Sequence, residues 1–79
     1  MSAPAQPLTS LPVGTKAVVA EIKLPPDQRG RILEMGLLNG TQVELVRFAP
    51  LGDPVEIKVR GYNLSLRKHE AELISVRPL

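Results

Sequence analysis

Apolar and polar residues alternate most regularly over residues 55–67. Every second residue from Val55 to Val59 is apolar, the residues between them are charged, and Leu64 and Leu66 repeat the alternation. A period of two places the apolar side chains on one face of an extended chain, as in a half-buried strand. The pattern therefore predicts two strands joined by a sharp turn.

Three further strands are expected elsewhere in the chain. Residues 16–23 are partly apolar on both faces, which suggests a well-buried strand. Residues 41–48 also alternate, but the apolar positions change face after Leu45, and this change predicts a bulge or a strong bend. Residues 49–54 are rich in proline and glycine and predict a fixed turn, and residues 73–76 predict a last short strand.

One helix is expected between the first two of these strands. Proline suits the first turn of a helix, which places its start at Pro26, and Asp27 then interacts favourably with the helix dipole. Gly36 can adopt the left-handed conformation that ends a helix, and Leu37 can then fold back onto Ile32. Residues 68–71 predict a second, single helical turn.

These elements indicate the fold class. A chain of 79 residues is too short for a large sandwich, and a closed barrel removes exposed strand edges. We predict a mainly β protein: a small SH3-like barrel of five to six strands, with one α-helix inserted after the first strand and a short helical turn near the C-terminus.

The domain organisation is simple. Residues 1–7 are small, polar and rich in proline, so we expect a disordered tail followed by one barrel domain over residues 8–79. The sequence has no apolar targeting segment and no transmembrane run of about eighteen apolar residues. It also has no cysteine, as is common in a reducing compartment, so a cytoplasmic location is expected.

Composition argues against two classes of ligand. The formal net charge is only +2, because acidic residues lie among the basic ones, and aromatic residues make up 3% of the chain. Nucleic-acid binding relies on basic clusters and stacking rings, and proline-rich peptides need a groove lined by several aromatic side chains. Phe48 and Tyr62 are too few for either, so neither ligand is expected.

The candidate chemistry centres on His69, the only histidine in the chain. No base lies in a pattern that would activate a nucleophile, so we expect no enzyme activity. His69 with Glu70 or Glu72 could supply two metal ligands, fewer than the three or four of a dedicated site. We therefore expect no metal site in the monomer; a weak or intermolecular divalent transition metal, bridging two molecules through His69, stays open.

A protein partner is the remaining class of ligand. Met35, Leu37 and Leu38 lie where the helix ends, and either they close the open end of the barrel or they form an exposed apolar groove flanked by Arg31 and Glu34.

Arg67 has two interpretations as well. It is either a partner-binding residue or, as we prefer, a structural residue that pairs with Glu70 or Asp53.

The order of several short motifs resembles the FeoA family. The resemblance covers residues 8–77, and no single motif is specific, although the ordered set is. The motifs are Leu11-Pro12-x-Gly14, Leu33-x-x-Gly36-Leu37-x-x-Gly40, Ala49-Pro50-x-Gly52-Asp53-Pro54, Val59-Arg60-Gly61 and Leu64-Ser65-Leu66-Arg67-x-x-Glu70-Ala71-x-x-Ile74-x-Val76.

The resemblance implies an SH3-like barrel and a cytosolic accessory role in bacterial ferrous iron uptake. The implied partner is the FeoB membrane transporter, through either its cytoplasmic GTP-binding region or its membrane part, with the membrane reached only through that partner. Related domains end iron-dependent repressors, so a metal-responsive sensor is the alternative. A homo-oligomer is possible, because small barrels with unpaired edges can dimerise.

Overall fold

A computed structural model describes residues 4–79 and contains six strands, two α-helices and one short 3₁₀ helix. The elements, in chain order, are β1 (Gln6–Pro7), η1 (Leu8–Ser10), β2 (Lys16–Ile22), α1 (Pro26–Glu34), β3 (Gln42–Phe48), β4 (Val55–Val59), β5 (Tyr62–Leu66), α2 (Lys68–Glu72) and β6 (Ile74–Pro78).

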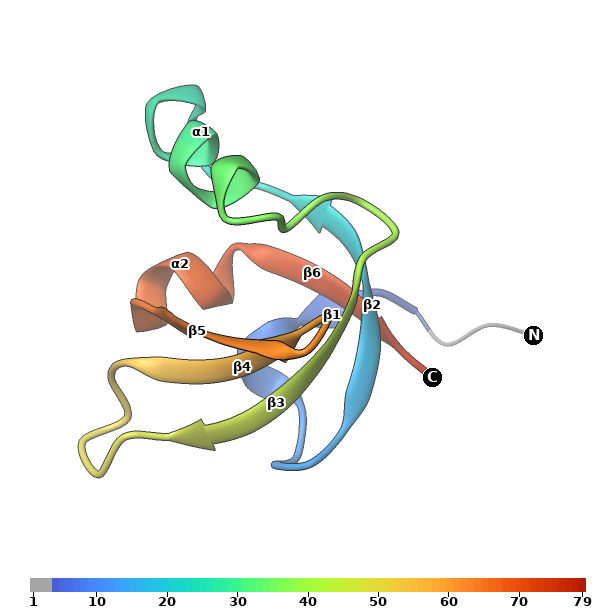
Figure 1. The fold of residues 1–79 in the computed structure, drawn as a ribbon, viewed down its shortest axis with the longest axis vertical. Helices are drawn as coiled ribbons and strands as arrows, with labels where there is room; N and C mark the ends of the chain where they lie inside the picture. Colours follow the sequence, from blue (N-terminus) through green and yellow to red (C-terminus); the bar gives the residue numbers. More distant parts are fainter. Residues whose placement is uncertain (1–3) are drawn as a thin grey trace.

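The six strands form one antiparallel sheet in the order β1-β6-β2-β3-β4-β5. The sheet is strongly curved, and the two helices lie beyond the same end of it, α1 after β2 and α2 after β5 (Figure 1). The expected mainly β barrel, with one inserted helix and a short helix near the C-terminus, is confirmed. The inserted helix follows the second strand and not the first, because β1 lies in the segment predicted as a tail.

The core is aliphatic and combines the inward residues of the alternating strands with apolar residues of the helices and loops. Val55, Ile57 and Val59 of β4 are fully buried, as their period of two predicts. The expected bulge in β3 is confirmed, since the register with β4 shifts between Leu45 and Arg47. Burial of these side chains is what stabilises a domain of this size.

The predicted tail over residues 1–7 is wrong at Gln6 and Pro7. Both residues form β1, which pairs with Ser75 and Val76 of β6 at the edge of the sheet. An edge strand tolerates proline, because a missing N–H that faces outward costs no ladder hydrogen bond. Residues 1–3 of the predicted tail lie outside the described residues.

The C-terminal end of α1 has the predicted conformation. Gly36 has φ +95°, its N–H donates to Leu33 O at 3.0 Å, and the Leu37 N–H donates to Ile32 O at 3.3 Å. These two bonds define a Schellman motif, which turns the chain so that Leu37 is buried beside Ile32.

Replacing Gly36 with alanine is expected to cost about 1 kcal/mol more than replacing Gly40, because it also removes a hydrogen bond. Both glycines have positive φ, so both replacements meet similar backbone strain. An added Cβ at Gly36 would lie 2.5 Å from the Tyr62 hydroxyl, whereas nothing lies within 4 Å at Gly40. The Tyr62 hydroxyl donates to the Met35 carbonyl oxygen, and this bond would break.

Urea unfolding of the two single variants measures this difference in the free energy of unfolding. Equal losses for Gly36→Ala and Gly40→Ala would contradict the role given to Tyr62.

Candidate partner-binding surface

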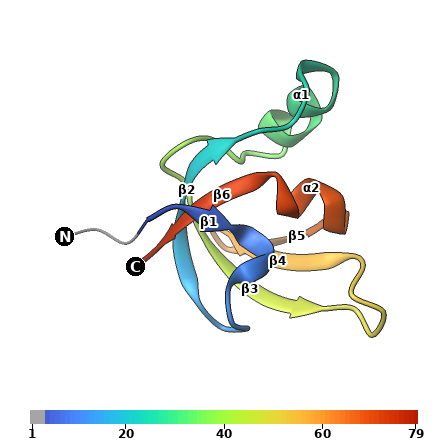
Figure 2. The same cartoon turned by 180° about the vertical axis from the view of Figure 1, so that it is seen from behind.

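Helix α1 projects from the barrel and contributes little to the core. Both views show it beyond the end of β2, apart from the body of the sheet (Figures 1 and 2). Ile32 is its only buried residue, and Leu24 before it and Leu37 after it are buried at its two ends. Most of the other side chains of α1 are therefore exposed, and several are available for contacts outside the domain.

A groove of about 460 Å³ lies between α1, the end of β2 and the loop after the helix. Ile22, Leu33 and Leu38 give it apolar walls, and Leu33 and Leu38 are 40% and 50% exposed. We call this depression the α1 groove. Its remaining lining residues are polar: Glu21, Arg29 and Asn39.

Arg29 is held at this groove by a hydrogen bond from Nη2 to Leu24 O at 3.1 Å. Its guanidinium and the Glu21 carboxylate place one charge of each sign on the rim. Apolar side chains surrounded by polar and charged ones are the usual composition of a protein interface.

The three apolar residues predicted as either barrel core or groove divide between the two. Leu37 is fully buried and cannot contact a partner, so as a partner-binding candidate it is wrong. Met35 is half-buried and packs against the core, with Sδ 3.7 Å from Arg31 Nη1. Leu38 is exposed and lines the α1 groove.

The flanking residues of the groove also differ from those predicted. Arg31 lies on the opposite side of α1 from the groove, and Glu34 is exposed but does not line it. Successive helix residues are separated by about 100°, so Arg29 and Arg31 point in nearly opposite directions. Leu33 and Arg29 line the groove but were not among the predicted residues. Leu33 could have been found, because it is an apolar helix residue beside Ile32, and two adjacent helix residues cannot both face the core fully.

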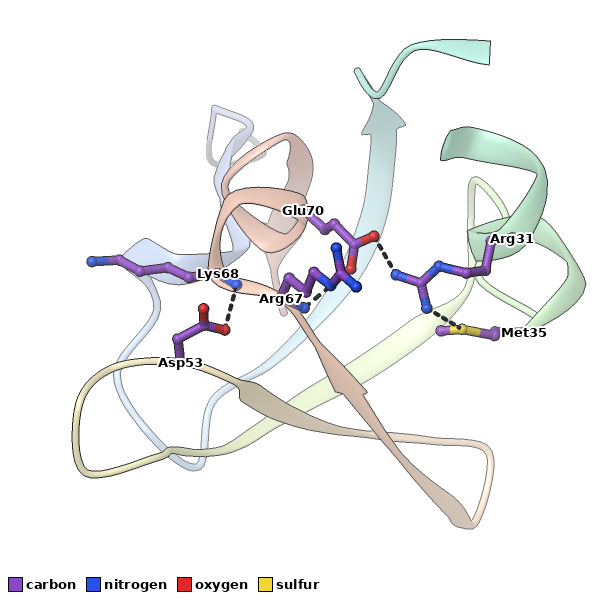
Figure 3. Close-up of polar contacts among 6 residues, drawn as sticks. All are labelled: Arg31, Met35, Asp53, Arg67, Lys68 and Glu70. Carbon is purple, nitrogen blue, oxygen red and sulfur yellow. Dashed lines mark hydrogen bonds and ion pairs between the residues drawn. The ribbon is translucent and has the colours of Figure 1, made fainter. Parts of the chain in front are cut away.

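A second depression, of about 250 Å³, separates α1 from α2. Its centre is the ion pair between Arg31 Nη2 and Glu70 Oε2, which joins the two helices (Figure 3). The Glu70 side chain is 4% exposed and the Arg31 side chain 50% exposed. We call this depression the α1–α2 cleft; its lining residues are Asp27, Gln28, Arg31, Arg67, His69 and Glu70.

The Glu70 carboxylate is stabilised in its charged form. Burial alone raises its pKa, but the hydrogen bond from Arg31, the Arg67 backbone N–H at 3.1 Å, and the charges of Arg31 and His69 lower it by more. The net result is a Glu70 pKa below its ordinary value of 4.5. Glu70 therefore acts as a structural anion and not as a proton donor near neutral pH.

Arg67 does not form the predicted side-chain pair with Glu70 or Asp53. Glu70 accepts the Arg67 backbone N–H at the start of α2, and Asp53 Oδ1 accepts the Lys68 backbone N–H at 3.0 Å (Figure 3). Within residues 4–79 the two ion pairs are Arg31–Glu70 and Arg47–Glu56. The exposed Arg67 guanidinium lines the α1–α2 cleft and is available to a partner.

The three candidate metal ligands lie in different environments. Glu70 is buried and bonded to Arg31, so metal binding there would break the ion pair. His69 and Glu72 are exposed on α2. Over residues 4–79, no three histidine, aspartate or glutamate side chains gather closely enough to hold a metal ion.

None of the helices within residues 4–79 has the length and apolar character needed to cross a membrane.

The sequence model of the FeoA domain matches residues 6–78. A curated fusion protein of Porphyromonas gingivalis, which joins Fe(2+) transport protein A to the Fe(2+) transporter FeoB, is 41% identical over 69 residues. The match covers 87% of this chain, which spans only 8% of the length of that relative.

Two solved structures are similar over nearly the whole chain. The solution structure of the FeoA protein from Chlorobium tepidum is 39% identical, with a TM-score of 0.88, over 94% of this chain and 70% of that one. The crystal structure of FeoA from Stenotrophomonas maltophilia, a prokaryotic SH3 domain protein complexed with zinc, is 31% identical. Its TM-score is 0.74, over 94% of this chain and 89% of that one.

Proposed function

This chain belongs to the FeoA domain family, and from that premise we propose that it is an accessory protein of ferrous iron uptake. It binds a FeoB-type transporter and modulates it by contact, without chemistry of its own. The observation that carries this proposal is the Porphyromonas gingivalis protein, in which a related domain and the transporter form one polypeptide. Fusion keeps two modules at high effective concentration, which is useful when they act together.

The α1 groove is the docking surface that we assign to this partner. It combines exposed Leu33 and Leu38 with the rim charges of Glu21 and Arg29. An apolar segment of the transporter would bury the two leucines, and its polar flanks would meet the rim. The transporter's cytoplasmic region or the cytoplasmic side of its membrane part supplies the segment, which places this chain in the cytoplasm.

Aspartate in place of Leu33 or Leu38 is expected to weaken binding of the transporter at least about tenfold, because a charge would be buried in the contact. Both residues are partly exposed, so folding should be little affected. Leu51→Asp is the matched control, since Leu51 is 96% exposed in the loop after β3.

Biolayer interferometry with the FeoB-type transporter of the same organism, reconstituted in nanodiscs, measures the affinity. No binding by the unchanged chain, with and without guanine nucleotide, would overturn the proposed function. Equal binding by all three variants would instead overturn only the assignment of the groove.

A metal-responsive sensor is the second candidate, and the zinc in the Stenotrophomonas maltophilia structure favours it. His69 and Glu72 are both exposed on α2. They would supply two ligands to a site shared between two molecules, and the second molecule would have to supply the others. Saturable Fe(II) binding that is lost in His69→Ala would favour this candidate over the accessory role.

A further inference from the structure

Strand β5 lies at an edge of the sheet, and so does β1. The two edges differ in what they offer. β1 has only two residues and ends in Pro7, which has no N–H to donate. β5 has five residues, Tyr62–Leu66, none of which is charged or a proline. The devices that commonly protect an edge strand are thus present at β1 and absent at β5.

The hairpin before β5 fixes which backbone groups face outward. Arg60 and Gly61 form its two-residue loop with φ +48° and +92°, the values of a type I′ turn. Such a loop closes on a hydrogen-bonded pair, here Val59 and Tyr62.

Hydrogen-bonded and non-hydrogen-bonded pairs alternate along an antiparallel ladder. Tyr62, Leu64 and Leu66 therefore bond to β4, and the N–H and C=O groups of Asn63 and Ser65 point away from it.

Both of these residues are exposed. Neither takes part in a backbone bond outside the β4–β5 ladder within the part of the chain that the structure describes. The edge therefore presents two donors and two acceptors, evenly spaced along the strand and accessible to a further strand.

We propose that β5 pairs with β5 of a second copy of this chain, antiparallel, about a two-fold axis at Leu64. This register places Asn63 opposite Ser65 of the second copy, and the reverse, so that all outward groups of these residues are bonded between the copies. Each contact residue is uncharged, so the edge does not repel its own copy.

Because β1 is a poor partner for strand pairing, the assembly is expected to stop at a closed dimer. A head-to-tail contact of β5 with β1 would extend into a filament, but Pro7 and the short length of β1 leave it little to bond with. The β5–β5 contact uses the same surface on both copies and stops at a dimer.

Sedimentation velocity of the full chain, from about 10 µM to about 1 mM, should show a shift from monomer to dimer. Amide hydrogen exchange, measured by NMR over the same range, should become about fivefold slower at Asn63 and Ser65 at the high end. The amide of Leu64 is an internal control, because its N–H already bonds to β4 and its relative protection should not follow dimerisation.

Two variants should prevent the contact between copies without removing a backbone hydrogen bond of the β4–β5 ladder. Ser65→Pro deletes one outward N–H, and Ser65→Lys adds a charge at the edge, where Glu56 on β4 lies opposite in register. Both should remain monomeric at about 1 mM. Gln42→Lys, which adds the same charge at an exposed position of β3, a strand that does not pair with β5, should dimerise like the unchanged chain.

A chain that stays monomeric up to about 1 mM would overturn the proposal. A dimer that persists in both Ser65 variants, or that protects no amide of β5, would overturn it as well. A folded spectrum of Ser65→Lys excludes unfolding as the reason for a lost dimer.

Discussion

Leu37→Ala is expected to lower the free energy of unfolding by about 3 kcal/mol, the usual cost of a large cavity in a core. Leu37 is fully buried and follows Gly36, whose Schellman motif brings the chain back onto the barrel. A domain of this size has roughly 3–5 kcal/mol of net stability, so the variant should be close to its unfolding midpoint. Urea unfolding followed by circular dichroism measures the loss.

The neighbouring residue provides the control. Leu38 is 50% exposed, so Leu38→Ala should change the free energy of unfolding by no more than about 0.5 kcal/mol. Comparing the two variants distinguishes the stability contribution of a core residue from that of the adjacent groove residue. Similar losses for the two variants would mean that the loop after α1 packs differently from the structure.

Glu70→Gln is expected to lower the free energy of unfolding by about 2 kcal/mol at neutral pH, because charge-assisted hydrogen bonds are stronger than neutral ones. The carboxylate accepts from Arg31 and from the Arg67 backbone N–H, and its side chain is only 4% exposed. Arg31 stays half in water, which keeps the cost below that of a fully buried broken pair. Glu72→Gln, on the exposed face of α2, should have little effect.

The effect of Glu70 on stability should depend on pH in one direction. Its pKa is lower in the folded chain than the ordinary value of 4.5, so folding favours the charged form. Its contribution is complete above the pKa of the unfolded chain and is lost as the pH falls through the lower folded pKa. The difference in the free energy of unfolding between the unchanged chain and Glu70→Gln should therefore be constant at neutral pH, down to about one pH unit above the ordinary pKa of Glu70. It should become smaller as the pH falls further.

Urea unfolding at a series of pH values measures this difference. A gap between the two proteins that widens on acidification would contradict the direction assigned to the Glu70 pKa.

Local signals were sufficient to predict most of the fold. The alternation from Val55 to Val59 describes a strand whose inward residues are fully buried, and Gly36 with Leu37 describes the end of a helix. Both depend on neighbours in the sequence, such as side-chain period and backbone freedom. Such features can be derived before any long-range contact is known.

Features that depend on distant residues could not be predicted in this way. Gln6 and Pro7 have the composition of a tail, but β6, about 70 residues later, offers an edge to which they bond. Composition indicates what a segment can bury and not what pairs with it. A disordered tail was therefore predicted over residues that include the whole of β1.

The candidate surface was predicted only in part for the same reason. Leu38, a groove candidate, lines the α1 groove, but Arg31, expected to flank that groove, instead faces Glu70, 39 residues away. The sequence predicts the helix, but it does not show which face of the helix packs against the barrel. Without that direction, Arg29 and Arg31 are equivalent in the sequence.

The small contribution of α1 to the core has a consequence for how such a chain can evolve. With Ile32 as its only buried residue, the helix can exchange most of its other side chains at little cost in stability. Recognition can then adapt, one substitution at a time, to changes in a binding partner, while the barrel keeps the same architecture.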